Sequence, residues 1–171
     1  MIIKYLYLVL ISFVFSTVVY SQNNKEIFTI YLVRHSEKEI SSNNNPELTK
    51  CGYLRSENLS FFLKDVPLDA VYSTDYQRTK NTAFPTAKSK ELKIEYYNPN
   101  NLEQFSKLLK NLKKDVLVVG HSNTTGVLAG LLIGKEIGAF DLNIYNRIYQ
   151  VVMYNKQGRL HLLNTVSDCI D

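Results

Sequence analysis

Short apolar runs alternate with longer mixed stretches along most of the chain. Four short runs predict strands: residues 27–33, 68–72, 92–97 and 115–119. The first of them is continuously apolar and β-branched, as expected for a strand that is buried on both faces. Four longer stretches predict helices: residues 49–63, 75–90, 100–113 and 123–133. Near the C-terminus, two further apolar runs at residues 148–154 and 160–165 predict a β-hairpin. This alternation predicts an α/β fold, a three-layer α/β/α sandwich with a mostly parallel central sheet and a C-terminal hairpin.

Three positions predict how the helices begin or break. Thr49 is suited to begin a helix, because its hydroxyl can accept a free amide of the first turn. Pro85 lies inside residues 75–90 and lacks an amide donor, so it should kink or restart that helix. Asn100, followed three residues later by Glu103, fits the start of the next helix, although asparagine replaces the usual serine or threonine of a capping box.

The first residues differ from the rest of the chain. Lys4 precedes residues 5–19, which are apolar apart from three hydroxyl side chains. This pattern predicts a secretory signal peptide over residues 1–21, followed by one domain at residues 22–171. The apolar run is shorter than the roughly 20 residues of a membrane-spanning helix, although an uncleaved anchor is the alternative. We expect an exported protein, periplasmic or secreted, without stable membrane association after cleavage.

Composition and charge narrow the classes of partner. The chain is 45% hydrophobic and 21% charged, and its formal charge of +4 falls to +3 without Lys4. So small a charge does not favour a nucleic-acid partner. Four lysines at helical spacing predict a solvated helix face: Lys107, Lys110, Lys113 and Lys114. Cys51 and Cys169 match no zinc spacing, but they could pair in an oxidising compartment.

Polar side chains follow three of the predicted strands where each one ends. Arg34 and His35 come after the first, Arg78 follows the second, and His121 comes after the fourth. Ligands of such sheets bind beyond the carboxyl ends of the strands, so these side chains should meet. Two guanidiniums suit the oxygens of a phosphate. One imidazole can attack phosphorus while the other, protonated, donates to an oxygen, and no metal or cofactor is required.

These residues resemble the histidine phosphatase superfamily, the phosphoglycerate-mutase-like proteins. Four segments resemble its motifs in order: residues 32–38 (LVRHSEK), Leu48, Thr49, Gly52 and Arg55 in the first helix, Tyr72 and Ser73 with Arg78, Thr79, Thr82 and Ala83, and residues 118–121 (VVGH). The resemblance implies a transient phosphohistidine on His35, with Arg34, Arg78 and His121 completing the pocket. Mutases of the family are generally longer than this chain, which favours hydrolysis of a phosphate monoester or a phosphohistidine.

The resemblance leaves the remaining contacts to the substrate less defined. Ser36 stands where many members have glycine, and Ser41 stands where many have a phosphate-binding asparagine. Ser41 and Ser122 are predicted to contact the substrate. The general acid is predicted to be Glu103, with Glu37 and Asp75 as alternatives. If none of these carboxylates serves, substrates with good leaving groups are favoured. The predicted partner is therefore a small phosphorylated compound or a phosphohistidine protein.

Two other functions compete with this interpretation. Residues 120–124 (GHSNT) approximate the nucleophile elbow of α/β-hydrolases, in which Ser122 would act with Asp141 and His161 as a serine esterase. That hypothesis leaves Arg34, His35 and Arg78 without a role. The other alternative is a catalytically inactive protein that binds phosphorylated ligands.

Overall fold

The fold is known from a computed structural model that describes residues 27–137 and 142–166. Its strands are β1 (Ile27–Arg34), β2 (Ala70–Ser73), β3 (Ile94–Tyr96), β4 (Val116–Gly120), β5 (Arg147–Tyr154) and β6 (Gln157–Asn164). Its helices are α2 (Lys50–Phe62), α3 (Gln77–Ser89), α4 (Leu102–Leu112) and α5 (Thr125–Ile133). The strands form one sheet in the order β3-β2-β4-β1-β5-β6. The predicted strands and helices are therefore all present in the described ranges.

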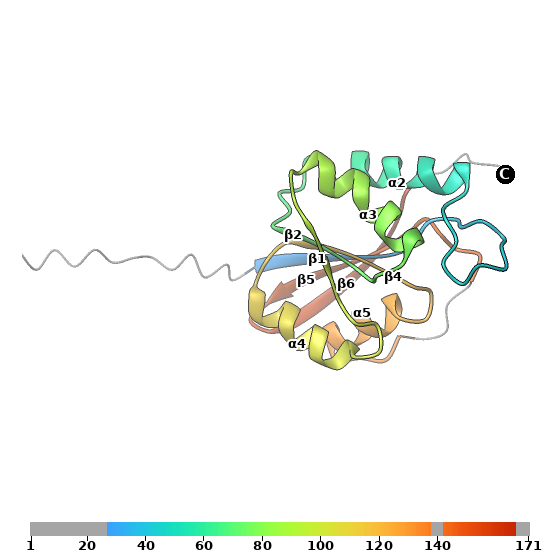
Figure 1. The fold of residues 1–171 in the computed structure, drawn as a ribbon. Coiled ribbons are helices and arrows are strands. Elements are labelled where there is room, and N and C mark those ends of the chain that lie inside the picture. The colour runs from blue at the N-terminus through green and yellow to red at the C-terminus, as the bar shows by residue number, and fades with distance from the viewer. Residues whose placement is uncertain (1–26, 138–141, 167–171) are drawn as a thin grey trace, which may run out of the picture.

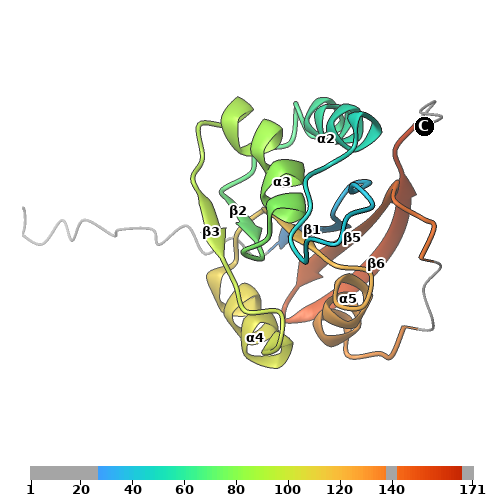
Figure 2. The ribbon, with the colours of Figure 1, turned by 45° about the vertical axis from the view of Figure 1, so that its right-hand side comes forward.

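Helices cover both faces of this sheet. Figure 1 shows α2 and α3 above it and α4 and α5 below it, and Figure 2 shows the same two groups after rotation. Alternate side chains of β4 point into opposite cores: Val116 and Val118 pack with residues of α4 and α5, whereas Leu117 and Val119 pack with residues of α2 and α3. Burial on both faces explains the unbroken apolar sequence of this strand. The predicted three-layer sandwich is confirmed.

The sheet is parallel from β3 to β1 and antiparallel beyond β1. β1 pairs in parallel with β4, while β5 pairs antiparallel with both β1 and β6. The predicted hairpin is confirmed, but its turn is tighter than the sequence pattern indicated. Tyr154 pairs with Gln157, so only Asn155 and Lys156 form the turn, and both have positive φ. A two-residue turn of this kind matches the twist of the flanking strands.

Two predictions about helices are corrected. α3 runs without interruption through Pro85, so this proline does not restart the helix. The predicted capping box of Asn100 and Glu103 is also wrong, because the residue that precedes α4 is Asn101 and its side chain makes no capping hydrogen bond. The amide of Asn100 instead donates to Oδ1 of Asn98 at 2.9 Å. This local turn occupies the amide that the capping box would have used.

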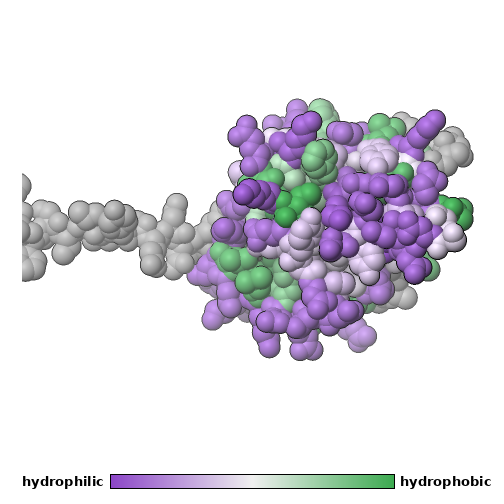
Figure 3. Space-filling model, in the orientation of Figure 1, coloured by the Kyte–Doolittle hydropathy of each residue, from purple (hydrophilic) through white to green (hydrophobic). Residues whose placement is uncertain are grey.

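Some of the predicted features lie outside the residues that the structure describes. The predicted signal peptide and Cys169 lie outside the described residues, whereas Cys51 is buried in α2 and takes part in a disulfide. Among the described helices, none is long and apolar enough to cross a membrane. Most of the face shown in Figure 3 is hydrophilic, with smaller hydrophobic areas between the polar side chains.

Candidate active site

The sheet order brings three strand ends together. β4 lies between β2 and β1, and all three run in the same direction, with Ser73 beside Val119 and Arg34 beside Gly120. The amide of His35 donates to the carbonyl oxygen of Gly120 at 2.9 Å, so the loops that follow β1 and β4 leave the sheet side by side. The residues predicted to bind phosphate therefore emerge at one edge of the sheet.

A cleft of about 400 Å³ lies at this edge, and all four predicted residues line it: Arg34, His35, Arg78 and His121. Ser122, Lys38 and Tyr76 also line it, as does the loop before α4. None of the described residues that line the cleft is a carboxylate. In the part of the chain that the structure describes, no group of three or more His, Cys, Asp or Glu residues is placed to hold a metal ion. The cleft is thus lined by basic and neutral polar groups.

The ring of His35 is held in one tautomer. Its Nδ1 lies 2.8 Å from the carbonyl oxygen of Ser36, which can only accept, so Nδ1 carries the proton. The amide of Ser36 in turn donates to the Thr82 hydroxyl at 2.9 Å, which helps to fix the residue whose carbonyl orients the ring. With the proton on Nδ1, Nε2 keeps a free lone pair. Nε2 is therefore the atom of His35 that can attack phosphorus.

Burial keeps His35 uncharged. Only 4% of the residue is exposed, and this burial lowers the pKa of His35 from 6.5 to about 3. The hydrogen bond to Ser36 acts in the opposite direction and raises the pKa, while the charges of Arg34, Arg78 and His121 lower it. The imidazole is consequently neutral at neutral pH, as a nucleophile must be.

A chain of hydroxyl groups fixes the second imidazole. Thr79 donates to the carbonyl oxygen of Thr74 at 2.8 Å, so its oxygen can accept from the Thr74 hydroxyl at 2.9 Å. With its proton used in this way, the Thr74 hydroxyl accepts from Nε2 of His121 at 3.0 Å. The rings of His121 and His35 lie 5.6 Å apart between centroids. Nδ1 of His121 is left as the ring nitrogen available to a ligand.

The protein groups alone keep His121 neutral. Burial, together with the positive charges of Arg78 and Arg34, lowers the pKa of His121 to about 4. The sequence predicts a protonated His121, but without a ligand in the cleft its lowered pKa leaves the imidazole neutral. A phosphate dianion in the cleft would favour the charged imidazole, because an opposite charge nearby raises the pKa of a histidine.

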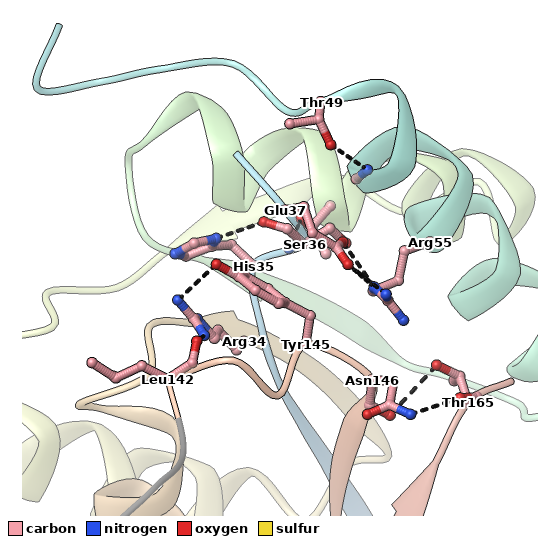
Figure 4. Close-up of polar contacts among 12 residues, drawn as sticks. Arg34, His35, Ser36, Glu37, Thr49, Arg55, Leu142, Tyr145, Asn146 and Thr165 are labelled. Carbon is pink, nitrogen blue, oxygen red and sulfur yellow. Dashed lines mark hydrogen bonds and ion pairs between the residues drawn. The ribbon is translucent and has the colours of Figure 1, made fainter. Parts of the chain in front are cut away.

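The loop after His35 is fastened to the first turn of α2 (Figure 4). The amide of Thr49 donates to the carbonyl oxygen of Glu37 at 3.0 Å, and the Thr49 hydroxyl accepts from the amide of Gly52. A Cβ atom on Gly52 would lie 2.1 Å from that same carbonyl oxygen. Nε of Arg55 donates to both carboxylate oxygens of Glu37, at 2.9 and 2.8 Å. The predicted first-helix pattern thus holds the loop that orients His35.

The candidate general acids lie apart from the lining of the cleft. Glu37 forms its ion pair with Arg55, and Asp75 accepts from the Lys80 ammonium at 2.9 Å. Glu103 is exposed in the first turn of α4 and is not among the residues that line the cleft. Its role as general acid stays a prediction.

The two serines predicted to contact the substrate have different positions. Ser122 lines the cleft, as predicted for a residue next to His121. Ser41 is exposed, its hydroxyl accepts from the amide of Asn43 at 3.0 Å, and it is not among the lining residues.

The structure does not bring the residues of the serine esterase alternative together. Ser122 lines the cleft, but His161 lies on β6, is not part of the lining, and has Nδ1 3.3 Å from Oε1 of Gln150. Asp141 lies outside the described residues. The histidine proposed for this alternative, His161, therefore does not line the cleft with its proposed nucleophile.

Sequence reasoning missed two tyrosines beside the arginines. The guanidinium carbon of Arg34 lies 4.0 Å from the ring centroid of Tyr145, and that of Arg78 lies 4.5 Å from the ring centroid of Tyr76. Neither tyrosine belongs to a motif or to a periodic pattern. Only the proximity of Tyr76 to Arg78 in the sequence could have indicated a contact.

Comparison with known proteins gives a family match for part of the chain. The family described as the histidine phosphatase superfamily (branch 1) matches residues 30–98. This segment contains Arg34, His35 and Arg78, while His121 lies beyond it. No curated protein matches the chain.

Solved structures show the same fold at low sequence identity. The alpha-ribazole phosphatase from Shigella flexneri is 16% identical, with a TM-score of 0.66 over 84% of this chain and 100% of that one. The protein histidine phosphatase SixA, complexed with tungstate, is 17% identical, with a TM-score of 0.67 over 80% and 97%. A mycobacterial glucosyl-3-phosphoglycerate phosphatase is 10% identical, with a TM-score of 0.65 over 82% and 100%. At these identities the likeness shows the fold.

Replacing Gly52 with alanine should destabilise the protein and lower any activity of the cleft. The new Cβ would lie 2.1 Å from the carbonyl oxygen of Glu37 and 3.0 Å from Cβ of Leu48, so the loop after His35 must shift. Strain of this kind costs about 1–3 kcal/mol. Urea unfolding of Gly52→Ala measures the loss, with the exposed Glu57→Ala on the same helix as control. Equal stability of Gly52→Ala and the unsubstituted protein would show that the loop is not confined as described.

The lowered pKa values of His35 and His121 predict that stability falls in acid. Below pH 6.5 the unfolded chain binds protons on both imidazoles, whereas the folded protein binds them only near pH 4 and pH 3. The contribution of the two neutral imidazoles to stability is therefore present in full above pH 6.5, and it decreases as the pH falls from there toward 4. The buried His35 accounts for a slope of up to ~1.4 kcal/mol per pH unit.

Urea unfolding between pH 7 and about pH 4.5 measures this dependence. The slope of the unfolding free energy against pH should be shallower in His35→Gln than in the unsubstituted protein, because up to one proton fewer is taken up on unfolding. Identical slopes in the two proteins would mean that His35 is not held neutral by the fold.

Proposed function

The chain belongs to the histidine phosphatase superfamily, and we propose that it is a metal-independent phosphatase that carries the phosphoryl group on His35. The observation that supports this most strongly is the fixed tautomer of His35, whose Nδ1 proton is bound to the Ser36 carbonyl. Nε2 is thereby left as an unprotonated nucleophile in a cleft that also contains Arg34, Arg78 and His121. A neutral imidazole beside two guanidiniums suits attack on a bound phosphate dianion.

The proposed reaction has two steps on one nitrogen atom. Nε2 of His35 attacks phosphorus, the bond from phosphorus to the leaving atom breaks, and the leaving group departs with that electron pair. Arg34 and Arg78 bind the equatorial oxygens, whose charge is the main target of stabilisation in phosphoryl transfer. Water then attacks the phosphohistidine, which releases inorganic phosphate and restores neutral His35.

Binding of the dianion prepares His121 for its role. Burial and the two arginines hold its pKa near 4, and a phosphate beside the ring raises that pKa. His121 can then take a proton on Nδ1 and donate it in a hydrogen bond to a phosphate oxygen. Its other nitrogen stays bound to Thr74.

The surroundings of the cleft favour a substrate with a weakly basic leaving atom. The carboxylates of Glu37 and Asp75 are paired with Arg55 and Lys80, and Glu103 does not line the cleft. A leaving atom of low basicity needs little protonation in the transition state. We propose a phosphohistidine or a small phosphate monoester of this kind as the substrate.

We also propose that the protein is exported. The apolar N-terminal segment with Lys4 has the pattern of a signal peptide. The disulfide at Cys51 suits an oxidising compartment such as the periplasm or the exterior. Small phosphorylated compounds are the substrates that fit this location best, whereas a phosphohistidine protein fits the absence of an acid from the described lining.

The rate should depend steeply on the leaving group. Because the described lining of the cleft holds no carboxylate to protonate the leaving oxygen, kcat/KM for an aryl ester such as p-nitrophenyl phosphate should exceed that for glycerol phosphate by at least the roughly 10²–10⁴-fold that acid catalysis supplies. A series of substituted phenyl phosphates, assayed without added metal, measures this dependence. Alkyl and aryl esters hydrolysed at similar rates would show that a general acid is present.

A phosphoenzyme should form on His35. Rapid quenching with a radiolabelled substrate should trap a label that is stable in base and labile in acid, as expected for a phosphoramidate. His35→Ala should carry no label, whereas Ser122→Ala should keep it. Labelling that survives in His35→Ala, or inactivation by a fluorophosphonate together with loss of activity in Ser122→Ala, would favour the serine esterase. Binding of phosphate without any turnover would indicate a protein that only binds phosphorylated ligands.

A further inference from the structure

Arg34 is held by the segment that leads into β5. Its Nη2 donates to the Tyr145 hydroxyl at 3.2 Å, and its guanidinium carbon lies 4.0 Å from the centroid of the Tyr145 ring. Nη1 donates to the carbonyl oxygen of Leu142. Figure 4 shows the guanidinium between these partners, with the Tyr145 hydroxyl directed toward His35. Arg34 thus has a ring face and two neutral oxygen acceptors as its partners.

Tyr145 is itself fixed by the end of the sheet. Its neighbour Asn146 accepts from the amide of Thr165 at 2.9 Å and donates from Nδ2 to the Thr165 carbonyl oxygen at 3.1 Å. β5 begins one residue later and pairs with β1, whose last residue is Arg34. The position of Tyr145 beside Arg34 therefore follows from the antiparallel pairing of these two strands.

Arg78 has a similar partner at the start of α3. Its guanidinium carbon lies 4.5 Å from the centroid of the Tyr76 ring, and the same ring lies 5.1 Å from that of His121 in an edge-to-face arrangement. The Tyr76 amide donates to the Thr74 carbonyl oxygen at 2.9 Å, which fixes the turn before the helix. A second aromatic ring thus lies against the second guanidinium.

The third arginine near the site is held differently. Arg55 forms an ion pair with the carboxylate of Glu37, which neutralises its charge. Among residues 27–137 and 142–166, no carboxylate pairs with Arg34 or Arg78. A carboxylate would fix these arginines equally well, but it would cancel their charge and repel a phosphate dianion. An aromatic face attracts a guanidinium without bringing a negative charge.

We infer that Tyr145 and Tyr76 are positioning residues that hold Arg34 and Arg78 by their ring faces and leave both positive charges available to a tetrahedral dianion. The inference rests on the proposed phosphate-binding role of the cleft. The two tyrosines act through the arginines, and they set the affinity of the site for the dianion rather than its chemistry.

Calorimetric titration with tungstate tests this without any turnover. The expected affinity of Tyr145→Leu is lower by roughly threefold to thirtyfold, the range that a lost contact of a cation with a ring supplies. Tyr145→Phe keeps the ring and should lose less, whereas Tyr145→Glu should lose more than Tyr145→Leu because it neutralises Arg34. Tyr76→Leu should behave like Tyr145→Leu. The matched control is Tyr154→Leu, an exposed tyrosine at the end of β5 that should bind tungstate unchanged.

Each outcome bears on the inference. Tungstate affinity that is unchanged in Tyr145→Leu overturns it, and so does an equal loss in Tyr145→Phe and Tyr145→Leu, because the ring face would then be irrelevant. Melting temperatures of all variants show whether a loss of tungstate binding comes from unfolding. If Tyr145→Leu unfolds, Tyr145→Phe and Tyr76→Leu still test the inference, which predicts a larger loss of affinity in Tyr76→Leu than in Tyr145→Phe. No binding by the unsubstituted protein also overturns it. Binding without hydrolysis contradicts only the proposed function.

Discussion

The burial of basic side chains close together in one cleft is the constraint on which the rest of this site depends. Arg34, Arg78, His35 and His121 line one cleft, and four positive charges there would oppose folding. The protein avoids this because burial and the two arginines lower the pKa of both imidazoles, to about 3 for His35 and about 4 for His121. Burial, assisted by this repulsion, therefore gives His35 the neutral form that can attack phosphorus.

The carboxylates around the site are consistent with this arrangement. Glu37 is paired with Arg55 behind the loop that follows His35, and Asp75 is paired with Lys80. Both carboxylates are neutralised by ion pairs outside the lining of the cleft, and the described lining keeps a net positive charge. This favours a dianionic ligand, and it leaves the leaving group without an evident proton donor. The geometry of the binding site and the expected class of substrate thus have one physical cause.

The sequence predicts the sheet and its polar edge well because both are local signals. The run at residues 116–119 is apolar throughout, as a strand buried on both faces requires, and His121 follows where it ends. The family match stops at residue 98, so the place of His121 beside His35 depends on the sheet order, with β4 next to β1. The alternation of strands and helices predicted a mostly parallel sheet but did not give its strand order.

Other features depend on contacts that a sequence pattern does not reveal. Tyr145 lies 111 positions from Arg34 along the chain, and only the pairing of β5 with β1 brings them together. The predicted capping box is absent because the amide of Asn100 donates to the side chain of Asn98. The sequence does not show which of several nearby side chains will accept from that amide. The tight turn at Asn155 and Lys156 was missed because neither residue is glycine, although both adopt positive φ.

The central claim is that the two imidazoles and two guanidiniums surround one tetrahedral oxyanion. A crystal structure of the protein with vanadate tests it most directly. The account predicts one vanadium in the cleft, with Nε2 of His35 in an apical position and with Arg34, Arg78 and His121 on the equatorial oxygens. Vanadate bound to the Ser122 hydroxyl, or bound away from His35 with the two arginines on separate ligands, would contradict it.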